Sequence, residues 1–580
     1  MLHHRHPGFI VLLCLVAQRK GMVIIMKYGL IGESLSHSLS KDVHARISDY
    51  SYDICEIAPE ELKGFCEARD FEGINVTIPY KEKIIPLLDE VDDHARRIGS
   101  VNTVINRGGR LYGYNTDFGG LCGLILHSGI EIKDKRVLIL GKGGTAKTAQ
   151  AVCESLGAAE IRIAARKSGA ETIEPDDYDA YTDSNVIINA TPVGMYPDCD
   201  RTPVDINRFT ELEGVIDCVF NPIRTRLVTV ARSRGIKAEG GLYMLVRQAV
   251  LAAELFTGDK IPYAKTDLVY GEMLYTKENM VLIGLPGCGK STVANAIFAM
   301  TGRICVDIAT EIEKRYGPTS FIIKKHGEQA YHELESKVIK DVASRMGIVI
   351  STSGGTVLND ENVTVLRQNG KIFFIDRSVD MIAPNLGPAA AALSLDSQKY
   401  SLYGNVCDVR IDGDRTIKEV AESVIYRFKR GDRASRIRLL VINGPNLNML
   451  GVRQPEIYGM ESYADLTKKI EDYCKKRPVD VAFFQSNHEG AIIDKIQEAY
   501  AKYDGLIINP AAYTHTSVAI ADAISAVMMP TVEVHISDIN AREPFRKINY
   551  ISPVCSKTIM GQGTDGYLSA VDALIAILGF

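Results

Sequence analysis

The sequence has no cysteine pair at C-x-x-C spacing, no surplus of basic residues and no apolar run long enough to cross a bilayer. Its twelve cysteines are scattered, so we expect reduced thiols in small buried core positions, without disulfides or a metal site. The formal charge of -5 excludes a basic nucleic-acid-binding surface, and no acidic block predicts a disordered tail. We therefore expect neither a nucleic-acid nor a membrane partner.

The N-terminus is the one segment with a targeting-like pattern. Basic HHRH precedes the apolar run 9–17, as in a secretory signal, but the run is too short to span a bilayer. Met22 or Met26 offers a second start directly before the strand-like run KYGLIG. We expect residues 1–21 to be an extension without function and the protein to be cytoplasmic.

At 580 residues the chain is too long for one core and suits roughly three to five domains. Short apolar runs alternate with helical patterns throughout, which is typical of βα units with parallel sheets. The expected strands are VLIL at 137, VIIN at 186, MVLIG at 280, GIVIS at 347, IRLLVING at 437 and GLIIN at 505. The rhythm breaks at 275–279 and 427–436. The sequence therefore predicts an α/β protein of three dissimilar modules, at 22–275, 277–432 and 436–580.

A glycine-rich turn follows the first of these runs. It contains Gly141, Gly143, Gly144 and Ala146 in a G-x-G-x-x-A pattern before a helical stretch. This spacing suits a pyrophosphate at a helix N-terminus, although a glycine turn without a ligand is an equal alternative for so short a motif. The next strand ends in Arg166 and Lys167, whose cations suit a 2′-phosphate and favour NADP over NAD.

Seven further segments of the first module carry a resemblance. They are SHSLS at 36, NVTIPYK at 75, GSVNTV at 99, YNTD at 114, NATPVGM at 189, DCVFNP at 217 and GLYMLVRQA at 241. With them the module resembles shikimate dehydrogenase along its whole length. The resemblance implies a two-domain enzyme with a Rossmann NADP domain and a catalytic pair, Lys81 and Asp117, in which Lys81 donates the proton. The implied substrate-binding residues are Ser38, Ser40, Thr77, Asn102 and Gln248.

The middle module contains GLPGCGKS at 284–291, a complete Walker A motif between an expected strand and an expected helix. Loop amides of this motif cradle phosphates, Lys290 reaches their terminal oxygens and Ser291 can ligate magnesium. The expected nucleotide-binding residues are Gly284, Gly287, Gly289, Lys290, Ser291, Thr292 and Asp307. We therefore expect ATP and Mg²⁺ to bind to a P-loop domain.

The middle module also resembles shikimate kinase, through CVDIATEIE, HGEQAYHELE, ISTSGGTVL and DVRIDG. Ala309 replaces a family carboxylate, His332 replaces the arginine that clamps the substrate, Ser353 begins the family's triple-glycine run, and the lid lacks its arginine. Each charge-assisted contact contributes about 1.5–3 kcal/mol, so losing two or three removes several decades of activity. We expect shikimate phosphorylation to be lost. An active kinase with a changed acceptor, for which His332 and Lys399 offer cations, and a nucleotide-binding scaffold remain alternatives.

The last module supplies a phenol, a guanidinium and an imidazole in Tyr458, Arg453 and His535. A fixed cation favours the phenolate of a tyrosine, whose ordinary pKa is about 10, and so makes it a usable base. His535 can protonate a leaving hydroxyl, and Asn446 and Asn509 can hold an enolate oxygen. These are the parts that an elimination beside a ketone requires.

In the order and spacing of NGPNLNMLGVRQPEIYG, NPAAYTHTS and EVHISDINAREPFR, the last module resembles type II 3-dehydroquinate dehydratase. The resemblance implies a flavodoxin-like parallel fold, Tyr458 as base, Arg453 as its activator, and His535 as acid oriented by Glu533. The further implied site residues are His515, Asp522, Ser537, Arg542 and Arg546. Because type II dehydratases assemble as dodecamers, a homo-oligomer is implied.

Together the resemblances imply a shikimate-pathway enzyme that converts 3-dehydroquinate to 3-dehydroshikimate and reduces this ketone with NADPH to shikimate. Lys41 stands where the dehydrogenase family usually has proline, and Phe220 where it often has tyrosine. A preference for quinate with NAD is therefore a further alternative.

Overall fold

The computed structural model describes residues 26–578 apart from 36–37, 166–178, 387–396, 431–436, 453–459, 478, 501, 528, 542 and 545–546. The expected N-terminal extension and six expected site residues, Arg166, Lys167, Arg453, Tyr458, Arg542 and Arg546, lie outside this part. The chain divides into two compact units, Met1–Leu274 and Tyr275–Phe580. No helix within the described ranges is long and apolar enough to cross a membrane.

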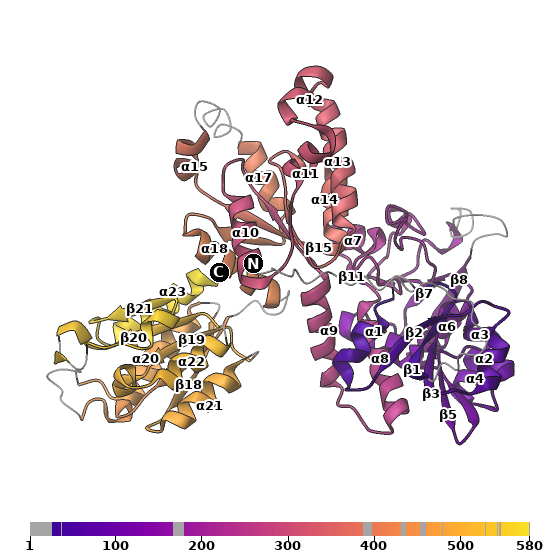
Figure 1. Cartoon of the computed structure of the whole chain (residues 1–580), viewed down its shortest axis with the longest axis horizontal. Coiled ribbons are helices and arrows are strands. Elements are labelled where there is room, and N and C mark those ends of the chain that lie inside the picture. The colour runs from indigo at the N-terminus through magenta and orange to yellow at the C-terminus, as the bar shows by residue number, and fades with distance from the viewer. Residues whose placement is uncertain are drawn as a thin grey trace, which may run out of the picture. The chain divides into compact units, whose positions relative to one another are not determined.

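The first unit begins with a mixed six-stranded sheet in the order β2-β1-β3-β5-β6-β4 (Figure 1). Its elements are β1 Met26–Gly32, α1 Ser40–Ile47, β2 Tyr52–Glu56, α2 Leu62–Ala68, β3 Phe71–Val76, α3 Tyr80–Lys83, β4 Glu90–Val91, α4 Asp93–Ile98, β5 Thr103–Arg107, β6 Arg110–Tyr114 and α5 Asp117–Ser128. Strand β1 is parallel to both neighbours, whereas β5 is antiparallel to β3 and β6. The ends of β1 and β3 therefore lie at the same edge of the sheet.

A parallel five-stranded sheet follows, in the order β11-β10-β9-β7-β8. Its elements are β7 Arg136–Leu140, α6 Gly144–Ser155, β8 Glu160–Ala164, β9 Val186–Asn189, β10 Gly214–Asp217, α7 Arg226–Ser233, β11 Lys237–Glu239, α8 Leu242–Thr257 and α9 Ala264–Lys277. The runs VLIL and VIIN form β7 and β9 as predicted, because a parallel strand covered on both faces can be apolar throughout.

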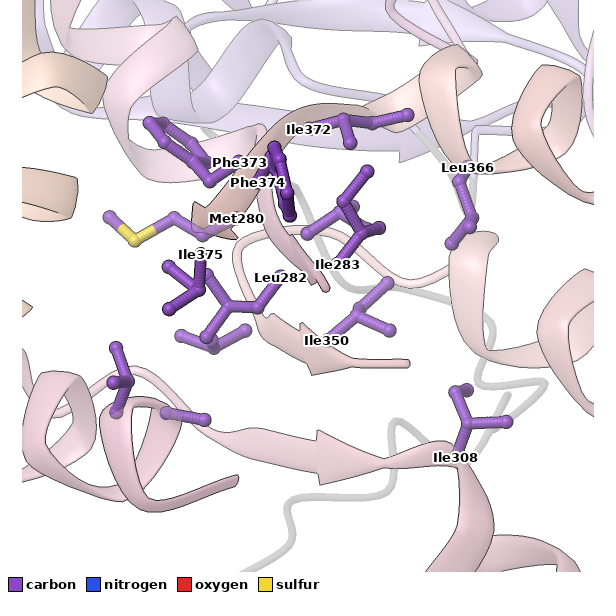
Figure 2. Close-up of a cluster of buried hydrophobic side chains, with 14 of the residues drawn as sticks. Met280, Leu282, Ile283, Ile308, Ile350, Leu366, Ile372, Phe373, Phe374 and Ile375 are labelled. Atoms are coloured by element: carbon purple, nitrogen blue, oxygen red, sulfur yellow. The ribbon is translucent and has the colours of Figure 1, made fainter. Parts of the chain in front are cut away.

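The second unit contains two parallel sheets, of which the first has the order β13-β14-β12-β15-β16. Its elements are β12 Asn279–Ile283, α10 Lys290–Thr301, β13 Cys305–Asp307, α11 Ile308–Tyr316, α12 Thr319–His326, α13 Glu328–Ala343, β14 Val349–Ser351, α14 Asp360–Asn369, β15 Gly370–Asp376, α15 Val379–Leu386, α17 Ser397–Val406, β16 Val409–Asp412 and α18 Ile417–Arg430. Figure 2 shows its core, where Leu282 of β12 and Phe373 of β15 lie among other buried apolar side chains.

The other sheet has the order β18-β17-β19-β20-β21 and is also parallel throughout. Its elements are β17 Ile437–Asn443, α20 Tyr463–Lys475, β18 Val479–Gln485, α21 Glu489–Ala499, β19 Gly505–Asn509, α22 Val518–Val527, β20 Thr531–His535, β21 Lys557–Met560 and α23 Asp565–Ile577. The predicted α/β class and all six predicted strands are confirmed. Polar residues at the carboxyl ends of β17, β19 and β20 thus share one edge.

The cysteines only partly follow the expectation of buried core thiols. None of the eleven within the described residues forms a disulfide. Four are buried, at Cys66, Cys153, Cys288 and Cys474, and the other seven are half-buried. The expectation that every cysteine is buried was wrong, because several stand at the ends of strands and helices instead of at their centres.

Candidate active sites

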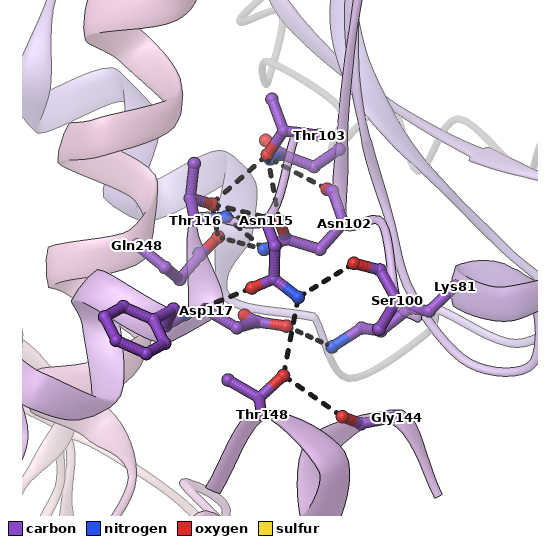
Figure 3. A network of polar contacts seen from close by, with 12 residues as sticks. Lys81, Ser100, Asn102, Thr103, Asn115, Thr116, Asp117, Gly144, Thr148 and Gln248 are labelled. Atoms are coloured by element: carbon purple, nitrogen blue, oxygen red, sulfur yellow. Dashed lines mark hydrogen bonds and ion pairs between the residues drawn. The ribbon is translucent and has the colours of Figure 1, made fainter. Parts of the chain in front are cut away.

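Lys81 and Asp117 form a close ion pair in the first unit. Lys81 Nζ lies 2.7 Å from Asp117 Oδ2, and the Asp117 side chain is 8% exposed (Figure 3). Lys81 comes from α3 after β3, and Asp117 from the first turn of α5 after β6. The buried Asp117 carboxylate fixes the direction of the Lys81 ammonium. This pair can present one proton from a defined position.

Two of the expected substrate-binding residues lie beside Asp117. The side-chain amide of Asn102 donates to Thr116 Oγ1 at 3.0 Å and approaches Gln248 Oε1 at 3.5 Å. The Thr116 backbone N–H donates to Asn102 Oδ1 at 2.7 Å. Figure 3 shows that this network adjoins the Lys81–Asp117 pair. It holds two amide side chains in fixed orientations next to the charged pair.

The other three lie near the edge where β1 and β3 end. The Thr77 N–H donates to Ile31 O at 3.0 Å, which fixes Thr77 against β1. Ser38 Oγ accepts from the Ser40 N–H at 3.2 Å as α1 begins. No described hydrogen bond joins these three side chains to Lys81 or Asp117.

The predicted glycine turn links β7 to α6. Gly141 has a φ of +117°, and a Cβ there would lie 3.1 Å from Ala190 O, so this position requires glycine. Gly143, the N-cap of α6, faces open space, and Ala146 is buried one turn later. A Cβ on Gly144 would meet Ser100 Oγ at 2.9 Å, which places the start of α6 against the loop that follows α4. The turn fits a dinucleotide, because its open backbone amides point out of a helix N-terminus next to the ion pair.

Asp217 is a buried carboxyl that sequence reasoning did not single out. It accepts hydrogen bonds from Asn189 Nδ2 at 3.0 Å, the Val219 N–H at 2.9 Å and Thr225 Oγ1 at 2.6 Å. Burial raises its pKa to about 6. The carboxyl ties together the ends of β9 and β10 and the start of α7, at the edge that carries the glycine turn. Its only signal in the sequence was its place in the segment DCVFNP.

The Walker A loop of the second unit has the backbone of a phosphate site. Gly284, Gly287 and Gly289 all have positive φ, at +150°, +77° and +94°. Lys290 Nζ donates to the carbonyls of Gly284 and Leu285 at 2.9 and 3.0 Å. The lysine therefore folds over the loop, and the residues fit the phosphates of a nucleotide.

Ser291 and Asp307 form the expected magnesium end of this loop. Ser291 Oγ donates to Asp307 Oδ2 at 2.6 Å, and Asp307 Oδ1 accepts from the Thr310 N–H at 3.0 Å as it caps α11. Burial alone would raise the pKa of Asp307, but hydrogen bonds from Ser291 and Thr310 hold it below its ordinary value. The ionised carboxylate and the hydroxyl are suitable ligands for Mg²⁺. Thr292 follows in the exposed first turn of α10.

Two residues by which the middle module departs from the kinase pattern, His332 and Ser353, surround a buried carboxylate. Glu335 of α13 is 1% exposed and accepts hydrogen bonds from Ser353 Oγ and from Thr356 Oγ1, the latter at 2.6 Å. Its other oxygen lies 3.2 Å from His332 Nδ1. A Cβ on Gly355 would lie 3.0 Å from the His332 ring, so the imidazole packs closely on this loop. Ser353 and His332, which replace the family's glycine and arginine, thus point at Glu335.

A pocket in the last module brings together five of the expected site residues. Its lining includes Asn446, Asn509, His515, His535 and Ser537. His535 Nε2 lies 2.8 Å from Glu533 Oε1, and Glu533 is fully buried. Of the seven expected residues within the described ranges, Glu533 lies behind His535, and Asp522 is exposed on α22 and does not line this pocket.

Two residues that the sequence did not reveal support Glu533. The Asn549 amide donates to both carboxylate oxygens, at 3.1 and 2.9 Å, and Thr558 Oγ1 donates at 3.1 Å. These bonds orient Glu533 toward His535. Asn549 and Thr558 lie 16 and 25 residues from Glu533, so no local sequence pattern links them to it.

Tyr567 was also missed. Its hydroxyl accepts from the Asn509 amide at 2.9 Å and donates to Asn443 Oδ1 at 2.6 Å. Burial raises the pKa of Tyr567, so the hydroxyl stays protonated. The tyrosine fixes the ends of β17 and β19 beneath the pocket.

Three family models match separate parts of the chain. They are "Shikimate dehydrogenase substrate binding domain" at residues 30–104, "Shikimate kinase" at 286–429 and "Dehydroquinase class II" at 437–575. Their order follows the three modules of the sequence. The chain is thus built from domains of enzymes of one metabolic route.

Curated relatives are similar to the outer modules. A 3-dehydroquinate dehydratase of Sulfurimonas denitrificans is 55% identical over 142 residues, covering 24% of this chain and 89% of the relative. A shikimate dehydrogenase (NADP(+)) of Clostridium beijerinckii is 35% identical over 245 residues, covering 40% and 91%. The chain therefore belongs to the shikimate dehydrogenase family through its first module and to the type II dehydroquinase family through its last.

Solved structures similar to single modules include two crystal structures. Shikimate dehydrogenase 1 from Peptoclostridium difficile is 36% identical with a TM-score of 0.40, covering 42% of this chain and 97% of that one. Type II dehydroquinase from Butyrivibrio crossotus is 55% identical with a TM-score of 0.24, covering 24% and 99%.

Proposed function

We propose that the chain is a multifunctional shikimate-pathway enzyme that dehydrates 3-dehydroquinate to 3-dehydroshikimate and reduces this product to shikimate with NADPH. We place its three domains at 22–275, 277–432 and 436–580, after an N-terminal extension at 1–21. One observation carries the proposal: the product of the reaction assigned to the last module is the substrate of the reaction assigned to the first. We place the enzyme in the cytoplasm, as a homo-oligomer assembled through the last module.

In the reduction, Lys81 gives a proton to the oxygen of the substrate carbonyl while Asp117 keeps the ammonium charged and aimed. NADPH, when bound, supplies the hydride to the carbonyl carbon. The glycine turn of α6 holds its pyrophosphate, and Arg166 and Lys167 pair with its 2′-phosphate. The substrate's carboxylate and hydroxyls bind to Ser38, Ser40, Thr77, Asn102 and Gln248.

In the dehydration, the Tyr458 phenolate removes a proton from the carbon beside the ketone, and Arg453 stabilises that phenolate. Asn446 and Asn509 hold the resulting enolate. His535 then gives a proton to the departing hydroxyl, which leaves as water while the carbon–carbon double bond forms. Glu533 orients His535, and the substrate is bound further by His515, Asp522, Ser537, Arg542 and Arg546.

A chemical test separates this route from an imine mechanism. Borohydride added with substrate leaves the dehydratase active, whereas Tyr458→Phe abolishes it. A covalent adduct on a lysine with loss of activity contradicts the phenolate route. Reduction of 3-dehydroshikimate by the same sample serves as the control for an intact chain.

The middle module binds ATP with Mg²⁺ and does not phosphorylate shikimate. The glycine loop, Lys290, Ser291 and Asp307 support nucleotide binding. The closed group around Glu335, together with Ala309, supports the loss of the acceptor site, because phosphoryl transfer depends mainly on positioning and charge stabilisation. Calorimetric titration with ATP and magnesium tests the binding.

A further inference from the structure

Arg377 directly follows β15 and lies over the Walker A loop. Its Nη1 is 3.6 Å from the position that a Cβ on Gly289 would take, and Ile417 Cδ1 lies at the same distance from that position. Gly413 packs on the other side, since a Cβ there would lie 3.0 Å from the arginine's Cβ and backbone N. The guanidinium is therefore confined between the phosphate loop and the loop that leads into α18.

No ion pair of this guanidinium is found among the residues that the structure describes. Its Nε is buried and has no hydrogen-bond partner in the part of the chain that the structure describes. A buried, unpaired donor of a charged group costs free energy, so such groups are usually satisfied by a partner.

Three carboxylates beside Arg377 are bonded to other groups: Asp376 precedes it in the chain, and Asp412 and Asp414 flank Gly413, which packs on it. Asp376 accepts hydrogen bonds from Arg410 and from Tyr400. The partner of Asp412 is Arg415, and Asp414 accepts from a backbone N–H. Within the described residues no ion pair holds this guanidinium, and the loop beside it has the backbone of a phosphate site.

We propose that Arg377 is a nucleotide-binding residue, whose guanidinium pairs with a phosphate of a nucleoside di- or triphosphate held by the Walker A loop. The inference rests on the nucleotide binding proposed above. It adds a second cation to the phosphate site beside Lys290, from the residue that directly follows β15. Arginine suits this role because its planar donors match phosphate oxygens.

The test is calorimetric titration of the full chain with ADP and magnesium. We expect Arg377→Met, which keeps the length of the aliphatic stem, to weaken ADP binding at least about tenfold, as for a lost charge-assisted contact. Arg377→Lys should retain part of the affinity. The matched control is Arg345→Met, which removes an arginine paired with Asp341 on α13 and leaves the affinity unchanged.

Equal ADP affinity of the wild-type chain and Arg377→Met, with Lys290→Ala impaired, overturns this inference alone. A wild-type chain that does not bind ADP overturns the proposed nucleotide site and the inference with it. Weakened binding in Arg377→Met, with part of the affinity retained in Arg377→Lys, supports the inference when the urea midpoint of the middle module is unchanged. A lowered midpoint in both variants assigns Arg377 a structural role and overturns the inference.

Discussion

Asp117 in the first module and Glu335 in the middle module are both buried carboxylates beside a basic side chain, but their surroundings differ. Asp117 contacts the Lys81 ammonium, and the Lys81 Cβ lies 3.8 Å from the position that a Cβ on Gly144 of the glycine turn would take. Glu335 is enclosed by two hydroxyls and an imidazole. A charged pair can serve a ligand when one member still has free hydrogen-bonding capacity. By that criterion the Lys81–Asp117 pair can bind a ligand, whereas the polar groups around Glu335 are bonded to one another.

The largest expected effect is the loss of dehydrogenase activity when the Lys81–Asp117 pair is broken. Lys81→Met removes the proposed proton donor, and general acid catalysis contributes about 10²–10⁴-fold, so the kcat for reduction of 3-dehydroshikimate should fall by about that factor. Lys83→Met, on the exposed face of the same helix, is the matched control. Dehydratase activity of the same sample should stay unchanged. A fall of less than about threefold would contradict the role of Lys81.

Asp217 extends the comparison to a buried carboxyl without any cation. Its pKa of about 6 in the folded state lies above the ordinary 3.8, so its protonated form stabilises the fold below about pH 4. That contribution is lost as the pH rises through 6, and about two pKa units correspond to about 3 kcal/mol. Asp217→Asn does not ionise. The stability of the variant relative to wild type should therefore improve between pH 4 and 7, measured as the inactivation temperature of the dehydrogenase. A pH-independent difference would contradict the raised pKa.

Substitution of Glu335 should lower the stability of the middle module and leave its ADP affinity unchanged. Glu335→Gln disturbs the hydrogen bonds from Ser353 and Thr356, and imperfectly satisfied buried groups cost about 1–3 kcal/mol. The urea midpoint for loss of ADP binding should fall, while ADP affinity in buffer stays within about twofold. Glu333→Gln, on the exposed side of α13, is the control. A large loss of ADP affinity without a change in midpoint would show that Glu335 belongs to the nucleotide site.

The sequence was sufficient for features that depend on neighbours along the chain. Apolar runs predicted β7, β9, β12 and their counterparts, because burial on both faces leaves a local pattern. The glycine turns were visible for the same reason, since their spacing is local. The partners of buried carboxylates were not visible. Ser353 is 18 residues from Glu335, so its hydroxyl could be read only as a lost glycine until the fold showed where it points.

We propose that the middle module retains its nucleotide half and has lost its acceptor half. The most direct measurement is mass spectrometry for shikimate 3-phosphate after the full chain is incubated with shikimate, ATP and magnesium. We expect no more product than with Lys290→Ala, although the wild-type chain binds ATP. Efficient formation of shikimate 3-phosphate, abolished by Lys290→Ala, would contradict this account and make the enzyme trifunctional.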